Sequence, residues 1–130
     1  MAGAATDYLE VKLLDHALGT TTYTKPTTVY VGLFTADPTD VAGGGTEVSG
    51  GSYARQSVTF AGASAGSAAS NSTVTFPTAT ANWGTITHLA IVDALTSGNR
   101  LFYGPVTTSK VIETGDTFQI TSGNLTISLD

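Results

Sequence analysis

The feature that most constrains the fold of this chain is a series of short β-type runs separated by turn residues. From residue 26 onward, runs rich in Val, Ile, Thr and aromatic residues recur about every 8–12 residues, with Gly, Asn, Ser and Pro between them. This spacing predicts an all-β fold, a two-sheet antiparallel sandwich of the jelly-roll type with about eight strands. The runs expected to form strands are residues 27–35, 53–60, 73–77, 86–93, 100–106, 110–114, 116–121 and 124–130.

Two parts of this pattern carry more specific expectations. Residues 27–35 have apolar side chains on both faces, which predicts a strand in the centre of a sheet. Residues 86–93 and 100–106 flank the turn-forming sequence SGN, so we expect them to form a hairpin. The pattern leaves the order of the strands in the two sheets open.

One amphipathic helix is expected before the β-type runs, in the stretch TDYLEVKLLDHALG. Asp7 is the candidate N-cap, and Glu10 follows three residues later, which is the spacing of a capping box. Gly19 is placed to end the helix in a left-handed turn. The apolar residues that we expect on one packing face are Leu9, Leu13 and Ala17, with Leu14 and Leu18 beside them.

Two segments between the expected strands have unusual compositions. Residues 36–52 form a long Gly-rich connection, and connections of this length in compact domains are usually functional or flexible. Residues 61–72 contain only Ala, Gly, Ser and Asn, which fits either a flexible linker or a segment where two backbones pack closely. We divide the chain into residues 1–25, a helix and connector that dock or pack on another surface, and residues 26–130, a single β-sandwich domain.

The charge pattern argues against several classes of partner. The 130-residue chain carries a net charge of −5, and its five basic residues do not cluster, which argues against nucleic-acid binding. It has no Cys, so disulfides, thiolate zinc sites and a Cys nucleophile are excluded. No apolar run approaches the ~20 residues of a membrane span, and residues 1–5 do not resemble a secretory signal. We therefore expect a soluble protein made in the cytoplasm, with no membrane partner.

The two histidines do not form an active-site pattern. A catalytic His needs an acid to orient it and a nucleophile beside it. His88 lies within an expected strand and Asp93 is five residues later, so the two side chains are expected on opposite faces. His16 follows Asp15 on the helix without a second His four residues away, which argues against a zinc site.

Three acidic residues and one Trp are the remaining candidates for a binding site. Asp37, Asp40 and Glu47 in the Gly-rich connection have the oxygen atoms that Ca²⁺ prefers, but their spacing does not match an EF-hand. Trp83 has a ring that could stack on a sugar, although a single Trp beside Gly84 is more often a core or interface anchor. We assign no catalytic, cofactor-binding or metal-binding residue, and we expect neither a cofactor nor enzymatic activity.

Several stretches of the sequence carry a resemblance to a known group of proteins. They are TTVYVGLFTADPTD, TEVSGGSYARQSVTF, VTFPTATANWGTITHLAIVDALTSGNRLFYGPV and GDTFQITSGNLTISLD, and LLDHALGTTTYT in the helical segment is similar as well. Between residues 8 and 130 the chain resembles small all-β virion structural proteins of tailed bacteriophages. Members of this group are described as tail-fibre-like or as capsid structural proteins, so the resemblance implies a component of the phage virion.

Our first hypothesis is a capsid decoration, or cement, protein on the capsid surface of the virion. Such a protein would bind the major capsid protein of the phage head and stabilise the assembled shell by mass action. We expect a homo-oligomer, and three-fold sites on a capsid favour a homotrimer. The expected contact elements are the N-terminal helix, residues 36–52 and, where subunits meet, residues 61–72. The alternatives are a tail or tail-fibre component and a β-sandwich module that binds a host glycan.

Overall fold

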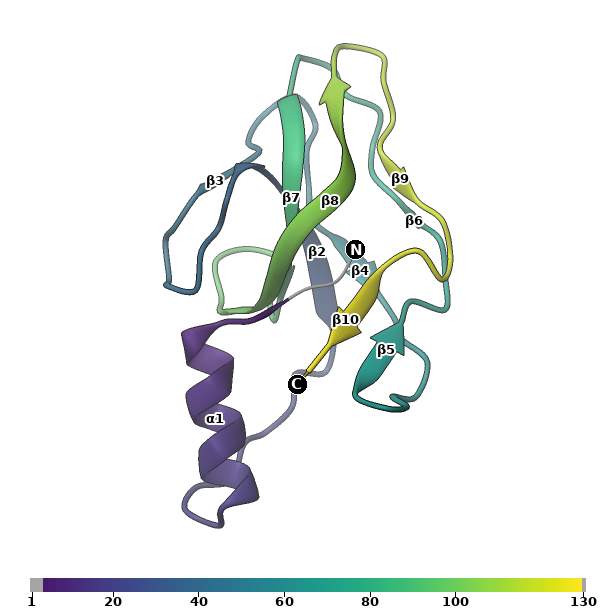
Figure 1. Cartoon of the computed structure of the whole chain (residues 1–130). Coiled ribbons are helices and arrows are strands. Elements are labelled where there is room, and N and C mark those ends of the chain that lie inside the picture. The colour runs from purple at the N-terminus through teal and green to yellow at the C-terminus, as the bar shows by residue number, and fades with distance from the viewer. Residues whose placement is uncertain (1–3, 130) are drawn as a thin grey trace.

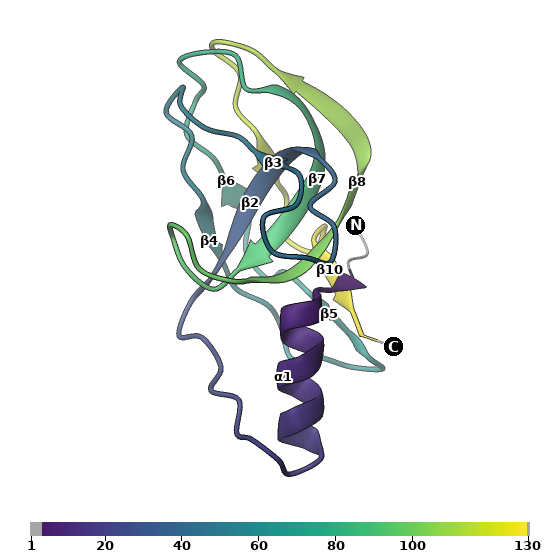
Figure 2. The same ribbon diagram turned by 90° about the vertical axis from the view of Figure 1, so that its left-hand side faces the viewer.

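The computed structural model of the chain describes residues 4–129. Residues 1–3, part of the segment compared with a secretory signal, and residue 130, the end of the last expected strand, lie outside the described part. Figure 1 shows a body of β-strands with one helix, α1 (Asp7–Ala17), projecting from it, and Figure 2 shows the same arrangement from the side. The predicted all-β sandwich preceded by one N-terminal helix is confirmed.

The larger layer of the sandwich is an antiparallel sheet of six strands. Its strands are β1 (Ala4–Ala5), β2 (Val29–Ala36), β3 (Thr46–Glu47), β4 (Gln56–Val58), β7 (Gly84–Val92) and β8 (Arg100–Ile112). Their order is β1-β8-β7-β2-β3, and β4 also pairs with β2. Because β2 pairs with β7 on one side and with β3 and β4 on the other, its predicted central place is confirmed. The predicted hairpin is also present, as β7 and β8.

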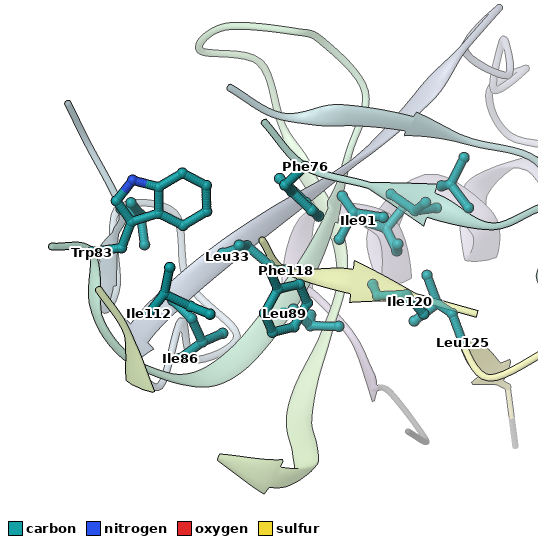
Figure 3. Close-up of a cluster of buried hydrophobic side chains, with 14 of the residues drawn as sticks. Leu33, Phe76, Trp83, Ile86, Leu89, Ile91, Ile112, Phe118, Ile120 and Leu125 are labelled. Atoms are coloured by element: carbon teal, nitrogen blue, oxygen red, sulfur yellow. The ribbon is translucent and has the colours of Figure 1, made fainter. Parts of the chain in front are cut away.

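The second layer consists of two separate two-stranded sheets. They pair β5 (Ser67–Ala69) with β10 (Thr126–Ser128), and β6 (Val74–Thr75) with β9 (Gln119–Ile120). Buried apolar side chains of β2 and β7 pack against those of β6, β9 and β10, so the main core lies between the two layers. Figure 3 shows members of this core, with Trp83 at one end and Leu125 at the other.

Aromatic rings fill one end of this core. The ring of Tyr53 stacks on that of Phe76 with centroids 6.1 Å apart, and it meets Trp83 edge-on at 5.5 Å. Phe118 packs edge-on against Phe76 at 5.8 Å. These offset and edge-to-face arrangements are the favourable ones for aromatic pairs. The Trp83 Nε1–H also donates a hydrogen bond to the Gly51 carbonyl at 2.9 Å, which ties the end of the Gly-rich connection to the core.

The N-cap of α1 is Thr6, one residue before Asp7, the N-cap that the sequence predicted. The hydroxyl oxygen of Thr6 accepts a hydrogen bond from the backbone N–H of Leu9 at 3.4 Å. Thr6 has the extended backbone of an N-cap residue, whereas Asp7 already belongs to the first turn, where its negative charge suits the helix dipole. Gly19 follows the helix with φ of +81°, the left-handed conformation expected at that position.

Two expected strands are a single strand in the structure. Residues 100–106 and most of residues 110–114 belong to β8, and the polar residues between them mark a change of register. Ile86 lies opposite Lys110, whereas His88 lies opposite Pro105. A step of two residues along β7 thus matches a step of five along β8, and β8 accommodates the difference as a bulge.

Residues 61–72 fold back on themselves, which supports the packed-segment interpretation over the flexible linker. The backbones of Ser64 and Ser67 exchange two hydrogen bonds, at 2.8 and 3.0 Å. The following strand, β5, then pairs with β10 near the other end of the chain. β1, β3 and β5 were not expected from the sequence, because each is only two or three residues long and depends on a distant partner.

Candidate interaction surfaces

The two residues that first suggested chemistry lie apart and have separate partners. His88 lies in β7, where its Nδ1 is 2.9 Å from the hydroxyl of Thr87. Asp93 follows the strand, and its carboxylate oxygens accept hydrogen bonds from the backbone and side-chain N–H groups of Asn99 at 2.7 and 3.1 Å. Asp93 therefore stabilises the turn between β7 and β8 and is not positioned to orient His88.

The three acidic residues of the Gly-rich connection also have separate partners. Asp37 accepts a hydrogen bond from a backbone N–H two residues later at 2.9 Å, and Asp40 accepts one from the Tyr103 hydroxyl. Glu47 pairs with Arg55. Within residues 4–129, no group of three or more His, Asp or Glu side chains is placed to hold a metal ion. The arrangement therefore gives no support to the calcium site considered for these residues.

Glu47 and Arg55 form a two-pronged ion pair. The Nε and Nη2 atoms of Arg55 each lie 2.8 Å from a carboxylate oxygen of Glu47. The hydroxyl of Tyr53 donates to the same carboxylate at 2.6 Å and accepts from the Leu33 backbone N–H at 3.0 Å. Arg55 Nη1 donates to two carbonyl oxygens in the β7–β8 turn, at 2.9 and 2.7 Å. The network thus joins the end of the Gly-rich connection, β2 and the β7–β8 turn.

The pKa values in this network suit a structural role. Burial alone would raise the pKa of the Glu47 carboxyl, but hydrogen bonds from Arg55 and Tyr53 and the charge of Arg55 hold it below its ordinary value. Burial and the hydrogen bond to Glu47 raise the pKa of the Tyr53 hydroxyl, and the same carboxylate raises the pKa of Arg55. A general acid or base works best with a pKa near the operating pH, and these shifts move all three groups away from it.

The Gly-rich connection, residues 36–52, is fastened onto the outer face of the main sheet. The guanidinium of Arg100 lies 4.7 Å from the centre of the Phe34 ring and donates to two carbonyl oxygens of the connection. The hydroxyl of Tyr103 donates to the carboxylate of Asp40, and this hydrogen bond raises the pKa of Tyr103 to about 12. Four anchors, counting the Glu47–Arg55 pair and the Trp83 bond, hold this segment in place.

Trp83 is a core anchor and is not placed to stack on a sugar. It is only 5% exposed and belongs to the main core, where Figure 3 shows it at one end of the cluster. A host-glycan site would therefore need residues other than this one.

An apolar groove is lined by residues of the β5–β10 pair and of the main sheet. The β5–β10 pair lies at the end of the body from which α1 projects (Figures 1 and 2). The volume of the groove, 440 Å³, falls within the range of about 300–1,000 Å³ that is typical of ligand pockets. The residues around it include Phe60, Ala63, Ile91, Phe102, Ile127 and Leu129, and none of the lining residues is charged. One wall comes from the small-residue hairpin of residues 61–69, so that segment helps to shape an open apolar surface.

The helix has two apolar stripes, and only one of them is covered. Leu9 is buried in a small cluster with Leu101, and Leu13 packs beside it. Val11, Leu14 and Leu18 lie at the spacing i, i+3, i+7 and are 57%, 59% and 77% exposed. The expected single packing face is therefore wrong for Leu14 and Leu18, which lie on the side of the helix opposite Leu9 and Leu13. It is also wrong for Ala17, which is exposed near the end of α1.

The connector after α1 turns back beside the end of the helix. The backbone N–H of Thr20 donates to the Asp15 carbonyl at 2.8 Å, and that of Tyr23 donates to Nδ1 of His16 at 3.1 Å. His16, considered as a metal ligand, thus orders this local turn. Figure 2 shows the connector returning from the far end of α1 to the start of β2.

The sequence carries a signal for the exposed stripe, although we expected only one apolar face on this helix. Val11, Leu14 and Leu18 are one apolar series, and Leu9 with Leu13 is another, on a different side of the same helix. A helix with two apolar stripes needs two partners. The groove carried no such signal, because its residues come from five separate parts of the chain.

Comparison with known proteins adds an independent observation. Residues 4–128 match the protein family described as podophage GP4 fiber I protein gp80. No curated protein matches the chain. The matched range contains α1 and both layers of the sandwich, so it includes the groove and the exposed stripe as well. Within the described part of the chain, no helix is long and apolar enough to cross a membrane.

Proposed function

The chain belongs to the podophage GP4 fiber I protein gp80 family, a family of phage virion structural proteins, and we propose that it is a subunit of a virion fibre. The observation that carries the proposal is the family match across residues 4–128. The match favours the tail-fibre alternative from the sequence. It lends no specific support to capsid decoration, in which the major capsid protein would be the partner.

The packing of the molecule supports a role that depends on shape. Among the described residues, every buried side-chain nitrogen or oxygen atom has a hydrogen-bond partner. In the Glu47–Arg55–Tyr53 network, the pKa of Glu47 is lowered and those of Arg55 and Tyr53 are raised, which favours a charged Glu47, a charged Arg55 and a neutral Tyr53. Such a body resists deformation and presents the same surface to each neighbour. In this proposal the protein acts by binding, without catalysis and without a cofactor.

The partners in this proposal are further copies of the chain and a neighbouring virion protein. Symmetric homo-oligomers are the common form of structural subunits, and a homotrimer is the state we propose here. Two exposed apolar surfaces on one small body, the stripe and the groove, support self-association. Contacts that are weak singly hold an assembly together when each subunit makes several of them.

Copy number in purified virions tests the proposal. Quantitative mass spectrometry of the particles gives the ratio of this chain to the major capsid protein. A fibre subunit is expected at a small fixed fraction of the capsid protein. A ratio close to that of the capsid lattice would instead support decoration of the shell, and absence of the chain from washed particles would contradict any virion role.

A further inference from the structure

The exposed stripe of α1 cannot reach the groove of its own chain. The first turn of the helix is fixed, because the Thr6 backbone N–H donates to the Leu101 carbonyl at 2.9 Å and the Thr6 hydroxyl donates to the Arg100 carbonyl at 2.6 Å. Leu9 is buried against Leu101, which also lines the groove. Leu18 is nine residues after Leu9, or two and a half turns of about 3.6 residues, so it points away from that side.

We propose that the stripe formed by Val11, Leu14 and Leu18 of one copy packs into the apolar groove of a second copy. The contact is head-to-tail, since each chain offers one stripe and one groove. A contact of this kind closes into a ring when its rotation allows, so every stripe and groove in the assembly is filled. The inference rests on the proposed structural role, and it assigns that role a specific interface.

The chemistry of the two surfaces matches. The stripe presents three aliphatic side chains that are each more than half exposed. The groove is lined by aliphatic and aromatic side chains and has no charged residue, so an aliphatic side chain entering it would not strip water from an ion. The wall of residues 61–69 consists of Ala, Gly and Ser, which permits a helix backbone to approach closely.

The charge of the chain does not oppose this contact. The protein carries a net charge of −5, so copies repel one another at most orientations. Residues 61–72 contain no charged side chain, and the acidic residues beside the stripe, Asp7, Glu10 and Asp15, would therefore face a neutral wall. This orientation avoids placing like charges against each other.

The area argument favours a closed ring over an isolated pair. Three helical side chains alone cover less than the roughly 800 Å² per partner that specific interfaces bury. In a ring each chain buries both its stripe and its groove, and a subunit can leave only when both of these contacts break together. A second copy is thus the occupant that gains most from both surfaces.

The absence of cysteine gives a direct test by disulfide cross-linking. Leu14→Cys and Ala63→Cys proteins are purified separately, mixed in their folded state and oxidised. A disulfide between the two variants joins a stripe to the groove of another molecule. The matched control mixes Leu95→Cys with Ala63→Cys, because Leu95 is also an exposed aliphatic residue, in the β7–β8 turn. We expect the first mixture to form the mixed disulfide several-fold faster than the control.

Equal rates in the two mixtures would overturn the proposal, and so would a Leu14→Cys protein that links mainly to itself. A second measurement does not depend on cysteine placement. Sedimentation of the unmodified protein is expected to show an oligomer, the double variant Leu14→Asp with Leu18→Asp a monomer, and Leu95→Asp the oligomer. A monomeric unmodified protein would contradict the inference. Both readouts use purified protein, so they can fail while the virion role stands, and the reverse is also true.

Discussion

Arg55 lies with its Nε and Nη2 atoms 2.8 Å from the two carboxylate oxygens of Glu47, and the two side chains are 11% and 21% exposed. Eight positions separate them in the sequence, yet Arg55 also bonds to the turn between β7 and β8. The pair is the point at which the Gly-rich connection, the central strand and that turn meet. It is therefore one of the four anchors that hold the Gly-rich connection on the outer face of the main sheet.

Replacing Arg55 with Ala should destabilise the protein by about 2–4 kcal/mol, because a mostly buried carboxylate loses its partner. Urea unfolding followed by Trp83 fluorescence measures this loss. The double variant Arg55→Met with Glu47→Gln should recover part of it, since the unpaired charge is then gone. Lys110→Ala, a change at an exposed lysine, is the control and should have little effect. A loss as small as that control would show that the pair contributes little.

Acid should weaken the same network. The pKa of Glu47 is lower in the folded protein than in the unfolded chain, so its stabilising contribution is complete above the unfolded value of about 4.3. That contribution is lost as the pH falls through the folded pKa. We expect Glu47→Gln to be less stable than the unmodified protein at pH 7, with the gap narrowing below about pH 4. Urea midpoints across this range test the prediction, with Glu113→Gln as the exposed control; a constant gap would contradict it.

Two neighbouring glycines offer a matched pair for the anchoring of the Gly-rich connection. Gly50 and Gly51 both have positive φ, of 75° and 58°. A Cβ atom on Gly50 would meet nothing within 4 Å, whereas one on Gly51 would lie 2.9 Å from Nε1 of Trp83. Gly50→Ala should cost about 1 kcal/mol of backbone strain, and Gly51→Ala about 1–3 kcal/mol more from the clash. Equal unfolding free energies for the two variants would mean that the Trp83 contact is not tight.

An element could be predicted from the sequence when the segments that pair with each other lie close together in the chain. The hairpin of β7 and β8 was predictable because its turn residues, its alternation and its pairing lie within one stretch. The long strand β8 was not, since the polar residues 107–109 look like a turn and are instead a bulge opposite β7. One strand with a bulge and two strands joined by a turn give the same sequence pattern. Only the register of pairing distinguishes them.

The interaction surfaces show the same limit. The aliphatic series Val11, Leu14 and Leu18 is readable from helical spacing, but its exposure depends on how far α1 extends beyond the β body. Residues 61–72 were equally compatible with a linker, because small residues have no strong preference of their own. Their pairing with β10, more than 50 positions later, decides between the two. Glu47 was considered only as a possible calcium ligand for the same reason: Arg55 becomes its partner only in the fold.

Removing residues 1–18 separates the role of α1 from that of the core. Among residues 4–18, the part of this segment that the structure describes, none belongs to the main core, so we expect a folded β domain. It should be less stable than the full chain, because Leu101 loses the cover of Leu9 and β8 loses its pairing with β1. Near-ultraviolet circular dichroism and urea unfolding measure both expectations. A chain that no longer unfolds cooperatively would place the helix within the folding core.

Electron microscopy of purified virions, labelled with an antibody raised against this protein, tests the central claim most directly. A fibre subunit that works through its shape and its contacts should be labelled at a few defined positions on fibres, on every intact particle. Particles that carry no label, with all of the protein recovered free in the lysate, would contradict the account.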